Sequence, residues 1–130
     1  MSITKPTFAA QRALEDIHIK YRRLDLPKGS LYFCEIQEGL TFDLFETKDG
    51  RITLWRYVGS ISDGTAVKPF EFHRLEYPNS VVGYHVNEEG DICFYASRLI
   101  DETERKMGNP ACRKLIAGFI RIIILMSKQG

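Results

Sequence analysis

The stretch LTFDLFETKDGRITLWRYV, residues 40–58, decides the predicted fold. Aromatic and β-branched residues, which favour extended structure, fill both halves of it. The dipeptide Asp-Gly at 49–50 separates the halves, and Asp-Gly between two apolar runs is a strong signal for a hairpin. We therefore expect two antiparallel strands joined by a tight turn.

The expected turn fixes which side chains share a face of this hairpin. A two-residue turn places Leu44 opposite Trp55 and Phe42 opposite Tyr57, so that all four side chains lie on one face. A loop of another length would move one strand's side chains to the other face. Large apolar groups occur on both faces, and two interpretations of the second face stay open. Either residues 60–79 cover it, or another protein molecule does.

The segments around this hairpin predict an α+β fold. Apolar residues at three- and four-residue steps indicate an N-terminal helix, and Asn109-Pro110 is a helix-start signal. We expect one domain over residues 1–130, with an antiparallel sheet of about five strands flanked by an N-terminal and a C-terminal helix. The expected elements are a helix over 7–23, a strand over 30–36, the hairpin over 40–58, a second hairpin over 80–86 and 92–97, and a helix over 110–127.

The charge and the cysteines narrow the class of protein. Eighteen basic and seventeen acidic residues give a net charge of +1, which provides no basic surface for nucleic acid. Three widely spaced cysteines without a C-x-x-C pair favour a reducing compartment over a disulfide framework or a zinc site. The longest apolar run, residues 119–126, is shorter than a membrane span, and the N-terminus lacks a signal-peptide pattern. We expect a cytoplasmic protein that does not enter membranes.

Motifs that carry chemistry are missing from the sequence. It contains no glycine-rich phosphate loop, no H-E-x-x-H and no G-x-S-x-G, so we expect no cofactor, no metal and no catalytic residue. The alternative is a small ligand-binding domain or enzyme that uses His73, His85 and nearby carboxylates. A turn at Glu89-Gly90 would place His85 and Cys93 on opposite faces of the second hairpin, which argues against a catalytic pair.

The order of elements resembles that of a known family, and the residues that carry the resemblance run from residue 72 onward. The segments FHRLEYPNS (72–80) and VVGYHVNEEGDICFYASRLI (81–100), followed by a long terminal helix, are similar in element order to type III secretion chaperones and to a related family of sensory-transduction regulators. The resemblance covers most of the chain and implies a homodimer that binds other proteins without catalysis. Secretion chaperones are typically acidic, whereas this chain is near neutral.

These observations together predict a non-catalytic, chaperone-like domain that holds a partner segment on an apolar face of its sheet. The partner is another protein or a second copy of the chain. Aromatic side chains bury a large area at a low entropic cost, so they suit such a face. The expected partner-binding residues are Phe42, Leu44, Trp55 and Tyr57.

Overall fold

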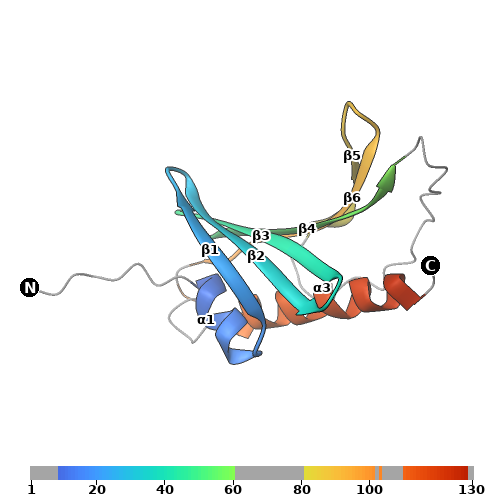
Figure 1. Ribbon diagram of the computed structural model, residues 1–130. Coiled ribbons are helices and arrows are strands. Elements are labelled where there is room, and N and C mark those ends of the chain that lie inside the picture. The colour runs from blue at the N-terminus through green and yellow to red at the C-terminus, as the bar shows by residue number, and fades with distance from the viewer. Residues whose placement is uncertain (1–8, 61–80, 102, 104–109, 129–130) are drawn as a thin grey trace, which may run out of the picture.

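The computed structural model describes residues 9–60, 81–101, 103 and 110–128, which form a sheet and two helices (Figure 1). The helices flank a six-stranded antiparallel sheet in the order β1-β2-β3-β4-β6-β5, so the predicted α+β class is confirmed with one more strand than expected. The elements are α1 (Ala9–Asp16), β1 (Lys20–Leu26), β2 (Gly29–Gln37), β3 (Leu40–Thr47), β4 (Arg51–Ser60), β5 (Val81–Val86), β6 (Asp91–Leu99) and α3 (Pro110–Lys128).

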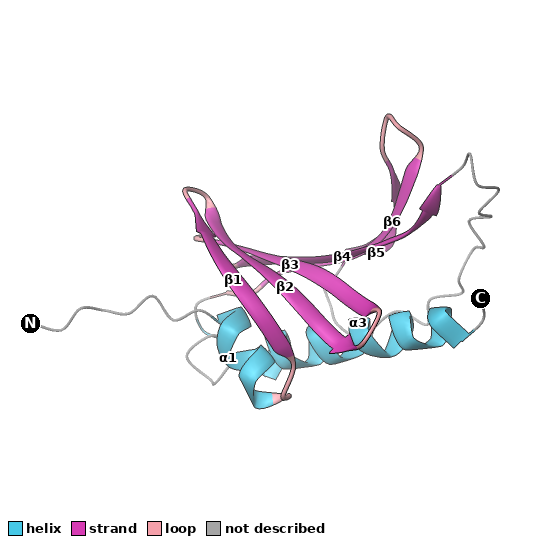
Figure 2. Cartoon of the chain, in the orientation of Figure 1, coloured by secondary structure: helices cyan, strands magenta, loops and turns pink. Residues whose placement is uncertain are grey.

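Both helices lie on the same side of the sheet (Figure 2). We call the side of the sheet that they cover the inner face. The core between the helices and the sheet contains three phenylalanine rings in contact, one from α3 and two from the sheet. The ring centroid of Phe119 on α3 lies 5.6 Å from that of Phe42 on β3 and 5.2 Å from that of Phe94 on β6. This stack ties the C-terminal helix to the middle of the sheet, because aromatic pairs at this spacing are favourable.

Helix α3 starts and packs as the sequence predicts. Pro110 occupies the first turn, where its missing N–H costs nothing. The buried positions follow a helical period along one side, which faces the sheet. They are Cys112, Leu115, Ile116, Phe119 and Ile123. In the described part of the chain, neither helix has the length and apolarity needed to cross a membrane.

The predicted helix over 7–23 is wrong beyond Asp16. His18 adopts a backbone φ of 60°, a left-handed conformation that ends a helix. Its N–H donates to the Glu15 carbonyl at 3.1 Å, and the Ile19 N–H donates to the Leu14 carbonyl at 3.0 Å. These two bonds form a Schellman motif, so the chain leaves the helix and residues from Lys20 onward become strand β1.

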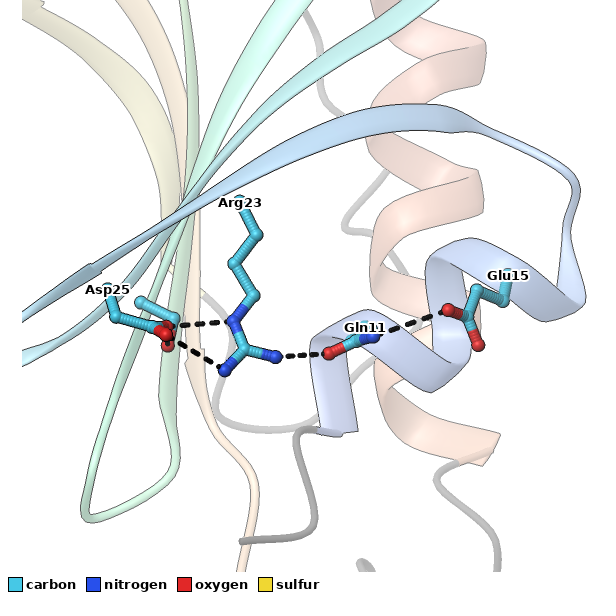
Figure 3. A network of polar contacts seen from close by, with 5 residues as sticks. Gln11, Glu15, Arg23 and Asp25 are labelled. Atoms are coloured by element: carbon cyan, nitrogen blue, oxygen red, sulfur yellow. Dashed lines mark hydrogen bonds and ion pairs between the residues drawn. The ribbon is translucent and has the colours of Figure 1, made fainter. Parts of the chain in front are cut away.

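A polar network fastens α1 to this unexpected strand (Figure 3). The Arg23 guanidinium donates to Asp25 Oδ1 at 2.8 Å and to Gln11 Oε1 at 2.5 Å. Glu15 accepts from Gln11 Nε2 at 3.3 Å and from the Tyr21 hydroxyl at 2.6 Å. Strand β1 is therefore held from two positions on the helix.

Buried Glu46 fixes the other end of α1 over the sheet. Its Oε2 accepts a hydrogen bond from the Ala10 N–H at 3.2 Å, and its side chain is only 6% exposed. The first N–H groups of a helix have no partner within the helix, and the helix dipole favours a negative charge there. Glu46 on β3 thus caps α1 from 36 residues away in sequence.

The predicted register of the first hairpin is wrong by one residue. Leu44 pairs with Leu54, and Asp43 pairs with Trp55. Strands β3 and β4 are joined by three residues, 48–50, because Gly50 occupies the left-handed fourth position of the turn with a φ of 98°. The Gly50 N–H donates to the Thr47 carbonyl at 3.1 Å. All side chains of β4 therefore lie on the face opposite to the predicted one.

The second hairpin contains the same type of turn, and its predicted register is also wrong by one residue. Gly90 has a φ of 84°, and its N–H donates to the Asn87 carbonyl at 3.0 Å. As a result His85 pairs directly with Cys93, and the prediction that these two lie on opposite faces is wrong. In both hairpins the first turn residue also accepts the N–H of the residue four positions on, through the hydroxyl of Thr47 and the amide of Asn87.

The turn geometry predicts the cost of a side chain at Gly50. Gly50→Ala should lower the free energy of unfolding by about 1–2 kcal/mol, because a Cβ is strained at positive φ. Lys48→Ala in the same loop is the control and should change it by less than about 0.5 kcal/mol. Urea unfolding measures both, and equal effects would contradict the assigned turn.

The buried hydroxyl of Tyr32 gives a second prediction. Tyr32 is 0% exposed, and its hydroxyl has no hydrogen-bond partner among the described residues. Tyr32→Phe should therefore leave the free energy of unfolding unchanged or raise it by up to about 1 kcal/mol. Its cross-strand neighbour Leu44, also 0% exposed, is the control, since Leu44→Ala should cost about 2–5 kcal/mol. A clear loss of stability in Tyr32→Phe would reveal a bond to the hydroxyl.

Candidate functional site

The candidate site is the side of the sheet away from α1 and α3, which we call the outer face. Among the described residues no helix lies on this side (Figure 1). Direct cross-strand pairing aligns one residue from each of the six strands in a row over it. From edge to edge the row reads Arg22, Phe33, Asp43, Trp55, Tyr95 and Gly83.

The outer face exposes more apolar surface than a solvated sheet face usually does. Phe33 is 46% exposed, Leu24 is 48% exposed and Tyr57 is 53% exposed. A second row lies on the same face, two residues away along each strand. It contains Leu24, Leu31, Phe45, Thr53 and Ser97. Contiguous aromatic surface of this kind marks sites of interaction with other molecules.

The structure divides the four residues that the sequence predicted as one cluster. Phe42 is 2% exposed and Leu44 is 0% exposed, because both lie in the core under the helices. Trp55 is half-buried and Tyr57 is exposed, and both belong to the outer face. The prediction that these four side chains share one face is wrong, because it followed from the wrong register of the first hairpin.

Sequence reasoning missed Phe33, which is 46% exposed on the outer face of β2. It alternates with Tyr32 and Cys34, which are both buried on the inner face. Alternation within SLYFCEI was the available signal. It shows that these neighbours lie on opposite faces, but not which of the two faces is covered.

A hollow of about 410 Å³ lies over the β1–β3 part of the sheet. Its lining combines basic, acidic and aromatic side chains, a mixture that suits polar recognition within an apolar wall. The lining residues are Lys20, Tyr21, Arg22, Phe33, Cys34, Glu35, Thr41 and Asp43. Burial raises the pKa of the Asp43 carboxyl, because the ionised form loses hydration there.

The observed register of the second hairpin brings a histidine and a cysteine side by side. His85 and Cys93 are direct cross-strand neighbours on the outer face, and Cys93 also pairs with Tyr57 on β4. However, burial raises the pKa of the Cys93 thiol, and the charges of Asp91 and Asp43 raise it further. A nucleophilic cysteine requires the opposite shift, so the arrangement does not provide an activated thiolate.

The other predicted sites are only partly covered by the structure. His73 and the segment 60–79 lie, apart from Ser60, outside the described residues. The alternative site built on His73 and His85 is therefore represented by His85 alone. Within the described ranges no group of three or more His, Cys, Asp or Glu side chains is arranged to hold a metal ion.

Comparisons with protein-family models, with curated proteins and with solved structures find no match to this chain. They therefore add no support to the resemblance to secretion chaperones. The function has to be inferred from the outer face itself.

The pKa of Cys93 predicts how its thiol reacts. A raised pKa means a smaller thiolate fraction at a given pH, so at about pH 8 iodoacetamide should alkylate native Cys93 more slowly than cysteines of the unfolded chain. Burial raises the pKa of Cys34 to about 12, and Cys112 is also buried, so both should react only on unfolding.

Peptide mass mapping after timed alkylation gives the three rates separately. Cys93→Ser is the control and should remove the modification of the native protein. Faster alkylation of Cys93 in the folded than in the unfolded chain, near neutral pH, would contradict this prediction and restore the case for a reactive cysteine.

Proposed function

We propose that this chain is a non-catalytic protein-binding domain that holds a segment of a partner on its outer face. The observation that carries the proposal is the exposed aromatic surface of the six-stranded sheet, centred on Phe33, Trp55 and Tyr57. Aromatic residues dominate the energetics of protein interfaces, because each buries a large area with few rotatable bonds. Phe42 and Leu44 support this surface from the core and do not contact the partner.

The size of the outer face supports a protein partner over a small molecule. Six strands at about 4.8 Å and seven residues at about 3.3 Å give a projected area of roughly 650 Å². A stable interface buries about 800 Å² on each partner, so a partner that covered the whole outer face would bury nearly a standard interface. The raised pKa of Cys93 argues against a cysteine nucleophile at the same surface.

We also propose the cellular compartment of the protein and the kind of partner that it binds. Free thiols at Cys34, Cys93 and Cys112 favour the reducing cytoplasm. The partner is another protein, and a second copy of the chain is the alternative occupant of the outer face. Both occupants would bury the same aromatic side chains, so one experiment distinguishes them.

Site-specific photocrosslinking tests this proposal. A photoreactive phenylalanine derivative replaces Tyr57, which is 53% exposed on the outer face, or Leu125, which is 51% exposed on α3. We expect one defined crosslinked product from position 57 and none from position 125 when cells that produce the protein are irradiated. Mass spectrometry of the product identifies a partner protein or a second copy. Equal crosslinking at both positions, or none at position 57, would contradict the proposal.

A further inference from the structure

Asp43 lies in the middle of the outer face, and among the described residues its direct neighbours on that face carry no charge. Its direct cross-strand neighbours are Phe33 on β2 and Trp55 on β4. Along β3 the next side chains on the same face are Thr41 and Phe45, since successive residues of a strand alternate between faces. All four neighbours are uncharged, and Asp43 itself is half-buried among them.

Among the described residues no basic side chain forms an ion pair with Asp43, although Lys20 and Arg22 line the same hollow and the Arg56 guanidinium donates to the Thr41 carbonyl at 2.5 Å. Arg22 lies in the same row but two strands away, because Phe33 separates the two side chains. Two strand spacings place their backbones about 10 Å apart. Lys20 pairs directly with Glu35. In agreement, burial is the cause of the raised pKa of Asp43, with no opposing contribution from a cation.

The surroundings of Asp43 match the chemistry of a cation. The face of an aromatic ring carries negative potential and attracts ammonium and guanidinium groups. Three rings, those of Phe33, Phe45 and Trp55, occupy neighbouring positions around the carboxylate. A half-buried carboxylate is costly to keep ionised when alone, and a bound cation would remove that cost.

We propose that Asp43, Phe33, Phe45 and Trp55 form a site for the ammonium or guanidinium head of a lysine or arginine side chain. The hollow of about 410 Å³, which Phe33 and Asp43 line, provides room for the aliphatic stem of that side chain. The inference rests on the proposed function, since the side chain is supplied by the partner segment on the outer face. It adds the chemistry of the partner, namely a basic residue among apolar ones.

The protein contains a built-in reporter for this site. Trp55 is the only tryptophan of the chain and is the cross-strand neighbour of Asp43. Its emission should change when n-butylguanidinium or n-butylammonium is titrated in, and the change should saturate. n-Butanol and butyrate have similar stems without a positive charge, and neither should produce a saturable change.

Asp43→Asn tests the role of the charge. This variant keeps the shape of the side chain and removes the charge, so the affinity for both cations should fall at least ten-fold. Its fold should be no less stable than the wild type, because the raised pKa of Asp43 shows that the folded state disfavours the ionised form. Glu88→Gln is the matched control, since Glu88 is an exposed carboxylate in the loop between β5 and β6 and does not line the hollow, and it should change the affinity less than two-fold.

Peptides link the site to partner binding. Twelve-residue peptides that alternate leucine with arginine, glutamine or glutamate should bind in that order of affinity, and Asp43→Asn should abolish the preference for arginine. Equal binding of the three peptides, or an unchanged preference in Asp43→Asn, would overturn the cation site while leaving the protein-binding face intact. Saturable binding of n-butylguanidinium together with no crosslinking at position 57 would support the cation site and contradict the proposed function. No response to either cation would overturn the inference.

Discussion

The three-residue loop between β3 and β4 determines which side chains form the core. Side chains of a strand alternate between two faces, so one residue more or less in the loop exchanges every side chain of the following strand. With three residues, Leu44 on β3 meets Leu54 on β4 under the helices, and β6 continues the layer through Ala96. The loop between β5 and β6 contains the same turn, in which the Gly90 N–H donates to the Asn87 carbonyl, and the inner face stays continuous across the whole sheet.

The same constraint creates the surface on which function is proposed. Once the aliphatic residues of β4 are committed to the inner face, Trp55 and Tyr57 have to lie outside. Strand β2 likewise places Phe33 on the outer face, because Phe33 alternates with two buried neighbours. An aromatic outer face and a tightly packed core are therefore two results of one register. A change that moved the aromatics inward would also expose the leucines of the core.

Local patterns in the sequence predicted most of the elements but neither register. The strands of both hairpins and the helix from Pro110 follow from composition and from a proline signal that act within a few residues. The register of each hairpin depends on the position of its glycine. A glycine inside a two-residue turn and a glycine at the end of a longer loop give strand pairings that differ by one residue. The side-chain acceptors Thr47 and Asn87, three residues before Gly50 and Gly90, were the available signal for the longer loop. Strand β1 was missed because a left-handed histidine ends α1, and the spacing of apolar residues does not reveal that conformation. The exposed site could be predicted only in part, since exposure depends on which face the helices cover.

The position of α3 in the chain has a consequence for how the protein is made. Strands β1 to β4 are neighbours in sequence and can pair once residue 60 has left the ribosome, whereas α3 begins at Pro110. At roughly 5–20 residues per second, the apolar side of this meander waits for several seconds on the ribosome without its cover. Helix α1, with eight residues, is too short to be stable by itself and packs against α3. The apolar side of this sheet thus stays uncovered by α3 until that helix has been made, and α1 and α3 then dock against each other.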